Sequence, residues 1–384
     1  MSDILVIGGG IAGLSAASAL AKHARVTILE GEDALGYHSS GRSVSFSHYG
    51  IGNAAVRGLT AWSRTFYEHQ PDGLCDTAIA RTAPSLYVAR KAQLPALEAL
   101  RAEMDRFTDA MRWLDEGEIL DLCPVLRTGP SGAVRAILDP TSLKLDADAL
   151  LQAHARALRR AGGSILTGRR IASIEHRAGR WQVTSESGES WSAPILINAA
   201  GAWGDHLAAL AGVRPIGLAP KRRTIIVVDP PPELDVSAWP FVHTAASDFY
   251  MLPEAGRLLI SPVDEVEDGP GDAQPEDYDV ALAAHQLEQY TSLAAGRIAH
   301  RWAGLRSFVA DRVPTAGFDD AAPGFFWLVG QGGYGLQTAP AMAAIVEALI
   351  TGGRWPEGLG SFGIAPSVVT PGRLRGGTTT AEAS

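Results

Sequence analysis

Three glycines near the N-terminus have the types and spacing that point most directly to chemistry. Gly8, Gly10 and Gly13 follow a short apolar run and precede an alanine-rich stretch, and a second apolar run ends at Glu30. A strand, a glycine turn, a helix and a second strand that ends in an acid form a dinucleotide-binding unit. Gly8 allows a tight turn, Gly10 lets the backbone approach a pyrophosphate, and Gly13 lets helix and strand pack closely. Glu30 stands where an acceptor for a ribose hydroxyl is expected, so we predict a bound dinucleotide.

A second glycine-rich loop, at 330–335, indicates which dinucleotide this is. The loop follows an apolar run at 324–330 that predicts a strand, and it precedes a helix that we expect Thr338 to cap. A helix N-terminus after a glycine loop attracts negative charge. A nicotinamide enzyme has no evident use for such a second site, whereas a reduced flavin carries negative charge near its pyrimidine end. The sequence therefore favours a flavin.

Composition excludes several classes of function. The chain has 384 residues and a net charge of −9, which argues against nucleic acid as a partner because phosphate binding needs a basic surface. Cys75 and Cys123 are its two cysteines and lie in no CxxC or Cys/His cluster, so we expect neither a disulfide framework nor a metal site. The apolar run at 4–21 contains three consecutive glycines and no basic residue precedes it, which argues against a signal or membrane segment. We expect a cytoplasmic protein.

The pattern of apolar and turn residues predicts an α/β fold. A helix at 147–161, strands at 164–166 and 193–198 and an antiparallel pair at 170–176 and 180–185 extend the nucleotide-binding unit. We predict a discontinuous Rossmann-type domain with a β-rich substrate domain inserted in two parts. The expected boundaries are 1–54, 136–215 and 315–365 for the first domain, 55–135 and 216–314 for the second, and 366–384 for a disordered tail. The acidic segment 263–279 is either a lid or, as we favour, a solvated loop.

Several motifs together resemble the FAD-dependent D-amino-acid oxidase, glycine oxidase and sarcosine oxidase superfamily. They are the opening fingerprint, Gly41-Arg42-Ser43, the run 198–203, the run 304–307 and the loop 330–335, in that order. The resemblance runs from about Asp3 to about Gly360 and is most similar to bacterial D-arginine dehydrogenases. It implies FAD, bound non-covalently because no cysteine follows Cys123. The cofactor-binding residues that it implies, together with the fingerprint, are Gly8, Gly10, Ile11, Ala12, Gly13, Glu30, Gly41, Arg42, Ser43, Ile171, Ala200, Gly201, Trp203, Gly330, Gly332, Gly333, Tyr334, Gly335, Leu336 and Gln337.

The resemblance also implies the chemistry and the residues that carry it. An amine with a hydrogen on the neighbouring carbon loses hydride to the flavin, and the resulting imine is hydrolysed. Arg306 and Arg222 match carboxylate-binding positions, which suits the fork of a guanidinium group. Arg222 belongs to a run of three basic residues, one of which should face inward. Tyr250 matches a tyrosine that lines the site.

The expected substrate follows from departures from the D-arginine dehydrogenase pattern. Ser85 takes the place of an acid that receives a guanidinium group, Phe46 replaces a histidine that recurs two positions later as His48, and Ile51 replaces a tyrosine. With Gly333 and Tyr334, these residues are the predicted substrate pocket. We expect an apolar D-amino acid or an N-substituted glycine, with oxygen or a quinone-type carrier as electron acceptor.

Three alternatives stay open from the sequence. The chain could be one subunit of a multi-subunit amino-acid dehydrogenase, or it could act on basic D-amino acids. A flavin monooxygenase is disfavoured, because the loop at 330–333 lacks the Gly-Asp contact of those enzymes.

Overall fold

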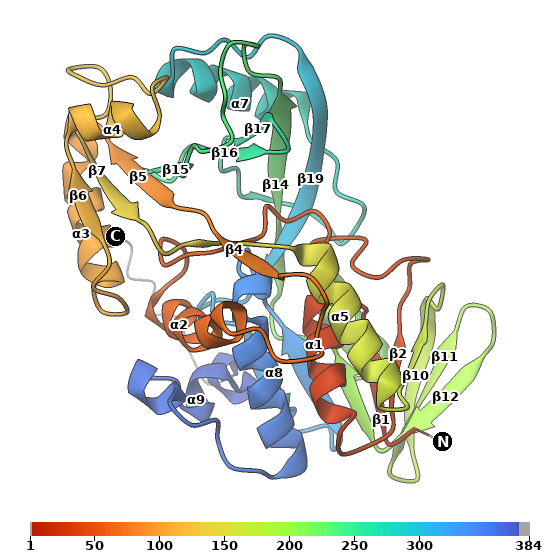
Figure 1. Cartoon of the computed structure of the whole chain (residues 1–384). Helices are drawn as coiled ribbons and strands as arrows, with labels where there is room; N and C mark the ends of the chain where they lie inside the picture. Colours follow the sequence, from red (N-terminus) through yellow and green to blue (C-terminus); the bar gives the residue numbers. More distant parts are fainter. Residues whose placement is uncertain (1, 376–384) are drawn as a thin grey trace.

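A six-stranded sheet forms the centre of one half of the molecule, in a computed structural model that describes residues 2–375. The strands follow the order β20-β21-β13-β1-β2-β9, parallel except for β20. Figure 1 shows this half below and the β-rich half above. The bounds are β1 Ile4–Ile7, β2 Val26–Leu29, β9 Ser164–Leu166, β13 Ile195–Asn198, β20 Thr315–Phe318 and β21 Phe325–Val329.

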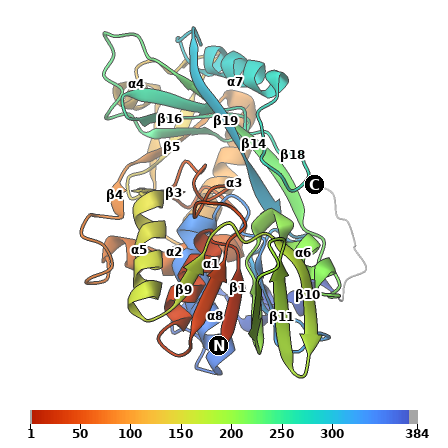
Figure 2. The ribbon, with the colours of Figure 1, turned by 90° about the vertical axis from the view of Figure 1, so that its right-hand side faces the viewer.

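Apolar side chains cover this sheet on both faces, as expected for parallel strands. Ile4 and Val6 of β1 pack with the helices on one face, and Leu5 and Ile7 pack with a three-stranded antiparallel sheet and a short helix on the other. Figure 2 shows the small sheet on the opposite side of β1 from α5. These elements are α1 Ile11–Leu20, α2 Ala54–Glu68, α5 Ala147–Arg160 and α8 Gly335–Thr351, then β10 Ile171–Arg177, β11 Arg180–Ser185, β12 Ser190–Ala193 and α6 Gly204–Leu210.

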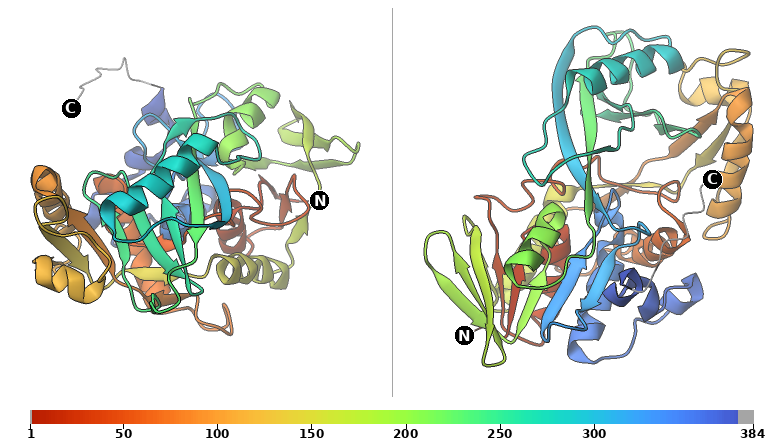
Figure 3. Two further views of the ribbon diagram at one scale, coloured as in Figure 1. Left: turned by 90° about the horizontal axis from the view of Figure 1, so that it is seen from above. Right: turned by 180° about the vertical axis from the view of Figure 1, so that it is seen from behind.

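The upper half is built on a nine-stranded sheet. Its longest strands, β14 and β19, pair with each other in antiparallel orientation and extend down to the lower half, and α7 packs against β14 and β17 (Figure 3). Strand β18 pairs with the edge of β14. The bounds are β5 Ser85–Ala89, β6 Arg112–Leu114, β7 Arg135–Asp139, β14 Ala219–Val228, β15 Phe241–Thr244, β16 Tyr250–Glu254, β17 Arg257–Ser261, β18 Val266–Glu267 and β19 Ile298–Phe308, with α3 Leu94–Met104, α4 Glu116–Leu122 and α7 Asp277–Tyr290.

A fourth, small antiparallel sheet lies where the two halves meet (Figure 1). It contains β3 Phe46–Ser47, β8 Leu143–Leu145 and β4 Ala80–Thr82. Strands β3 and β8 belong to segments that we expect in the Rossmann-type domain, whereas β4 belongs to the segment 55–135 that we expect in the substrate domain. The prediction of an α/β fold with a sheet-rich substrate domain is confirmed.

Three local predictions differ from the structure. Helix α8 begins at Gly335 after Tyr334, so Thr338 is not its cap; the Thr338 hydroxyl instead donates to the Tyr334 carbonyl within the first turn. Residues 366–375 are ordered, with a short helix α9 at Pro366–Val369, because Val369 is buried and Arg373 pairs with Asp311. The rest of the predicted disordered tail, 376–384, lies outside the described residues.

The acidic segment 263–279 is not one open loop. It contains β18, and its last residues form the first turn of α7, a helix that the sequence pattern did not reveal. In the described part of the chain no helix is long and apolar enough to span a membrane. Both cysteines are free.

Candidate functional site

A cavity of about 300 Å³, here called the nucleotide cavity, lies beside the glycine turn between β1 and α1. The N-terminus of α1 opens toward it at Gly10, which also lines the next cavity. Backbone N–H groups at a helix N-terminus favour phosphate. The predicted cofactor residues that line this cavity are Gly8, Gly10, Glu30, Ile171, Ala200, Gly201 and Trp203.

The glycines at this turn are required by close backbone approach. Gly8 has a φ of +113°, and a Cβ there would lie 2.3 Å from the Ala199 carbonyl oxygen. A Cβ on Gly13 would lie 2.0 Å from the Gly8 oxygen, so Gly13 packs against the turn and does not itself line the cavity. Glu30 Oε2 accepts a hydrogen bond from the Gly9 amide at 2.5 Å. The turn leaves a cradle free of side chains, which is what a pyrophosphate needs, so these residues fit FAD.

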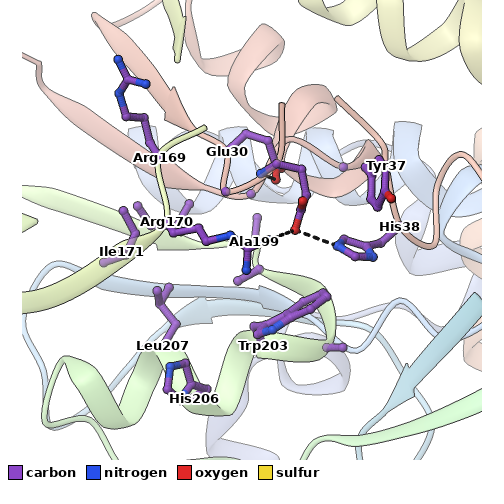
Figure 4. A pocket seen from close by; sticks show the side chains of 18 of the residues that line it. Glu30, Tyr37, His38, Arg169, Arg170, Ile171, Ala199, Trp203, His206 and Leu207 are labelled. Carbon is purple, nitrogen blue, oxygen red and sulfur yellow. Dashed lines mark hydrogen bonds and ion pairs between the residues drawn. The ribbon is translucent and has the colours of Figure 1, made fainter. Parts of the chain in front are cut away.

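Two polar contacts to Glu32 form a bridge across the rim of the nucleotide cavity. Glu32 Oε1 lies 2.7 Å from Arg170 Nη2 and 3.1 Å from His38 Nε2, and the His38 ring packs against Trp203 with 4.6 Å between ring centroids. Figure 4 shows Arg170 and His38 on opposite sides of the cavity, with Trp203 below them. The bridge and the indole therefore enclose the cavity from two sides.

A second cavity of about 150 Å³, the central cavity, continues from the first toward β19 and the C-terminal glycine loop. Arg42 anchors its wall, because Nη1 donates to the Ala273 and Ala303 carbonyls at 3.1 Å each. Gly41 and Gly330 do not line it and instead hold turns. The predicted cofactor residues that line the central cavity are Gly10, Ile11, Ala12, Arg42, Ser43, Gly201, Gly332, Gly333, Gly335 and Leu336.

The third cavity, about 350 Å³ and here called the substrate cavity, shares the Arg306 and Tyr250 wall with the central cavity. Its remaining predicted lining residues are Phe46, His48, Ile51, Gly333 and Tyr334. Three further residues predicted to bind the cofactor also line it, namely Ser43, Leu336 and Gln337. Side chains that sequence reasoning missed are Arg57, Tyr87, Leu100, Arg223, Phe241, His243 and Glu265.

Ser85 does not line the substrate cavity, contrary to the prediction. It is completely buried in β5, opposite Asp139 of β7. Residues two positions apart share a face of a strand, and Tyr87, further along the same face of β5, is the residue that reaches the cavity. Position 85 does not contribute to the cavity, so the absence of an acid there does not change the polarity of the substrate cavity.

Arg223, and not Arg222, shares the cavity face with Arg306. In the antiparallel pair, Lys221 stands opposite Arg306 and Arg223 stands two residues along on the same face. Arg222 points to the other face, where Nη2 lies 2.9 Å from Asp279 Oδ2 and Nη1 lies 2.8 Å from Glu276 Oε1 of the segment leading into α7. The prediction that Arg222 binds the substrate carboxylate is wrong, because its side chain lies on the other face of β14; Arg223 is the residue of the basic run that lines the cavity.

Arg306 is positioned to receive an anion. Its one ion pair among residues 2–375 is with Glu265, at 3.6 Å between Nη1 and Oε1, which is too long for a good hydrogen bond. Burial and the neighbouring charge of Arg223 lower the pKa of Arg306 to about 9, so the guanidinium stays protonated at neutral pH. A Cβ on Gly333 would lie 2.2 Å from Arg306 Nη2, so the glycine makes room for this side chain.

Neutral aromatic and imidazole rings form another part of the substrate cavity. His48 Nδ1 lies 2.7 Å from the Tyr87 hydroxyl oxygen, and the His243 ring stacks at 4.9 Å from His48 and 5.0 Å from Tyr87. Burial, with the charges of Arg306 and Arg57, lowers the pKa of His48 to about 3, and burial lowers the pKa of His243 as well. Both imidazoles are therefore uncharged at neutral pH and can offer hydrogen bonds without attracting an anion or a cation.

A model of the FAD dependent oxidoreductase (DAO) family matches residues 3–349. The chain belongs to this family. The sequence resemblance to it is therefore confirmed, as is the dependence on FAD. Among the residues the structure describes, no group of histidine, cysteine or carboxylate side chains could hold a metal ion.

Two curated relatives and one solved structure illustrate the similarity. One of the subunits of opine oxidase from Agrobacterium tumefaciens is 24% identical over 94% of this chain and 96% of its own length. Hydrogen cyanide synthase subunit HcnC from Pseudomonas aeruginosa is 24% identical over 66% of this chain, and the match spans 59% of HcnC. The crystal structure of glycine oxidase from Geobacillus kaustophilus superposes with a TM-score of 0.81 at 20% identity, covering 94% of this chain and 97% of that one.

Proposed function

We propose that this protein binds FAD non-covalently and oxidises the C–N bond of an amino acid, either a D-amino acid or an N-substituted glycine. The observation that carries the proposal is Arg306. Its half-buried guanidinium lies on the wall shared by the central and substrate cavities and has no close partner among the described residues. FAD, when bound, supplies the hydride acceptor for the carbon beside the amine. The product imine is hydrolysed to a 2-oxo acid, or to glyoxylate and an amine.

The residues of the cavity do the binding and orientation. Arg306 and Arg223 hold the substrate carboxylate, which places the carbon beside the amine against the central cavity. The same positive charges favour the uncharged form of an amine, because like charges oppose protonation. A neutral amine keeps the lone pair that hydride loss requires, so no general base is needed. The uncharged His48 is consistent with this role of the arginines.

The charges of the cavity also disfavour basic substrates. Glu265 is the one carboxylate among the described lining residues, and Arg312 holds it with two contacts of 2.8 Å. A guanidinium or ammonium group on the substrate would lose water without gaining a free acid. The charges that line the cavity, and not Ser85, therefore disfavour D-arginine and D-lysine as substrates.

A second candidate is a subunit that passes electrons to a partner chain. Two relatives, the opine oxidase and the hydrogen cyanide synthase proteins, are themselves subunits by name. In that form the acceptor is a quinone or another redox carrier in place of oxygen.

The test uses the purified protein with its flavin. Acid precipitation should release yellow FAD into the supernatant, whereas colour that stays with the pellet contradicts non-covalent binding. Anaerobic flavin bleaching is then scored with D-amino acids, their L-enantiomers, glycine, sarcosine and longer N-substituted glycines. Bleaching followed by turnover with an artificial acceptor supports an autonomous enzyme, and bleaching without turnover with either oxygen or an artificial acceptor favours the electron-passing subunit. No bleaching by any amine would refute the proposed reaction.

A further inference from the structure

A third arginine lines the substrate cavity and has no role in holding the first carboxylate. Arg57, from the first turn of α2, is 8% exposed, and its Nε donates to the Tyr49 carbonyl at 2.7 Å. Its terminal Nη1 lies 3.6 Å from Glu103 Oε2, which is too long for a hydrogen bond. Glu103 also pairs with Arg106 at 3.2 Å, so one exposed carboxylate is shared between two cations. The charge of Arg57 is poorly compensated.

Arg57 and Arg306 act on the substrate cavity from different elements. Both guanidinium groups are close enough to His48 to lower the pKa of its imidazole. Arg306 comes from β19, and Arg223 of the paired strand β14 lines the cavity with it. Arg57 comes from α2, and Leu100 of α3 also lines the cavity. The rings of Phe46 and Phe241 line the wall as well. The cavity thus offers two separate cationic positions together with apolar surface.

The balance of charge shows what such a cavity accommodates best. Three arginines, Arg57, Arg223 and Arg306, line it against the single acid Glu265 among the described lining residues. One substrate carboxylate at Arg223 and Arg306 leaves Arg57 without a close anion. An apolar group entering beside Arg57 would remove water from a buried cation and return no hydrogen bond. A carboxylate in the same place would form the charge-assisted, forked pair for which a guanidinium is suited.

We propose that the substrate carries a second carboxylate, which Arg57 receives. The substrate class is an amino acid with two carboxylates and a short apolar linker: an acidic D-amino acid, or a glycine whose N-substituent ends in a carboxylate. This inference rests on the proposed oxidation of an amino acid and narrows it. It also revises the expectation of a purely apolar substituent, because Phe46 and Ile51 account for only part of the wall.

The first test measures binding of inert acids to the FAD-loaded enzyme through the change in flavin absorbance. Each diacid from malonate to adipate is compared with the monoacid of equal carbon number, from propanoate to hexanoate. The inference predicts that at least one diacid binds about tenfold or more tightly than its monoacid, as expected for an added charge-assisted pair. Monoacids that bind as tightly as every matched diacid would overturn it, and this result needs no variant.

Variants then locate the effect. Arg57→Gln should bring the diacid-to-monoacid affinity ratio close to one, and Arg57→Lys should keep most of the preference because it keeps the charge. Arg106→Gln is the matched control. It also removes one positive charge that pairs with Glu103, but Arg106 lies outside the substrate cavity. Flavin content and thermal midpoint report on folding. A ratio that is unchanged in a folded Arg57→Gln protein, or lost equally in Arg106→Gln, would refute the role of Arg57.

Flavin bleaching by candidate substrates distinguishes the acidic D-amino acid from the N-substituted glycine. It also distinguishes failure of the second-carboxylate inference from failure of the proposed amino-acid oxidation. D-Glutamate and D-aspartate are compared with D-norvaline, and N-(2-carboxyethyl)glycine is compared with N-propylglycine. Faster bleaching by any of the three diacids than by its monoacid supports the inference and shows whether the substrate is an acidic D-amino acid or an N-substituted glycine. Efficient bleaching by the monoacids alone overturns the second-carboxylate inference but leaves the amino-acid oxidation standing. Bleaching by none of them refutes both.

Discussion

Replacing Arg306 by methionine should remove carboxylate recognition while leaving the fold largely intact. Arg306 makes no close ion pair within residues 2–375, so few native contacts are lost, and the methionine is similar in length and removes a buried like charge beside Arg223. The substrate loses one desolvated charge-assisted contact, which costs about 2–5 kcal/mol, or roughly 30- to 5,000-fold in kcat/KM. Because Arg223 remains, we expect the lower part of that range.

Arg222→Met is the matched comparison, since it changes the neighbouring position in the paired strand. Arg222 is 4% exposed and bonded to Asp279, which is itself buried, so its loss leaves an unpaired buried carboxylate. Breaking such a pair costs about 3–5 kcal/mol of stability. The assay is kcat/KM by anaerobic stopped-flow with the best substrate, and the unfolding midpoint in urea, for both variants. A large loss of kcat/KM in Arg222→Met without a loss of stability, together with normal carboxylate binding in Arg306→Met, would refute the assignment of the two arginines.

Three further outcomes follow from the geometry. Gly10→Val should give a folded but colourless protein, because its side chain would enter the space between the nucleotide and central cavities; flavin absorbance after gel filtration checks this. Gly333→Ala should raise KM by displacing the Arg306 guanidinium, 2.2 Å from the added Cβ, and a pyruvate-type competitive inhibitor should weaken in parallel. Burial lowers the pKa of His154 to about 4, below its unfolded value of 6.5. The unfolded chain therefore takes up the proton first as the pH falls. We expect the free energy of unfolding to decrease as the pH drops from about 7 toward 4. Urea titrations should show a shallower pH slope in His154→Gln and an unchanged slope in the exposed His285→Gln.

Local patterns were sufficient to predict the nucleotide-binding half. The glycine turn, the acid at Glu30 and the strand at Phe325–Val329 are each encoded within a short window, and the structure places them as expected. Helix α5 likewise begins beside its Asp146 cap, whose carboxylate accepts from the Ala149 amide. These elements are governed by turn chemistry and by burial on one or both faces, which a single sequence displays directly.

The substrate cavity could not be predicted in the same way, because long-range pairing builds it. Tyr87 and His243 meet because β5 and β15 lie side by side in parallel register, although more than a hundred residues separate them. Arg223 faces the same cavity as Arg306 because of one particular register between β14 and β19. A shift of one residue would exchange the faces of every side chain on the strand, and no local signal in Lys221-Arg222-Arg223 distinguishes the two possibilities.

Glu265 explains how two like charges can face one cavity before a substrate enters. Its Oε1 lies 3.5 Å from Arg223 Nη2 and 3.6 Å from Arg306 Nη1, so a single carboxylate is shared by both guanidinium groups. Burial would raise the pKa of Glu265, but the hydrogen bond and charge of Arg312, with the other two arginines, outweigh it and lower the pKa. The acid therefore stays ionised and partly compensates the pair. Its contact with Arg306 is too long for a hydrogen bond, which leaves the donors of Arg306 for an incoming carboxylate. The segment that the sequence suggested as a solvated loop thus supplies the counter-charge of the anion site.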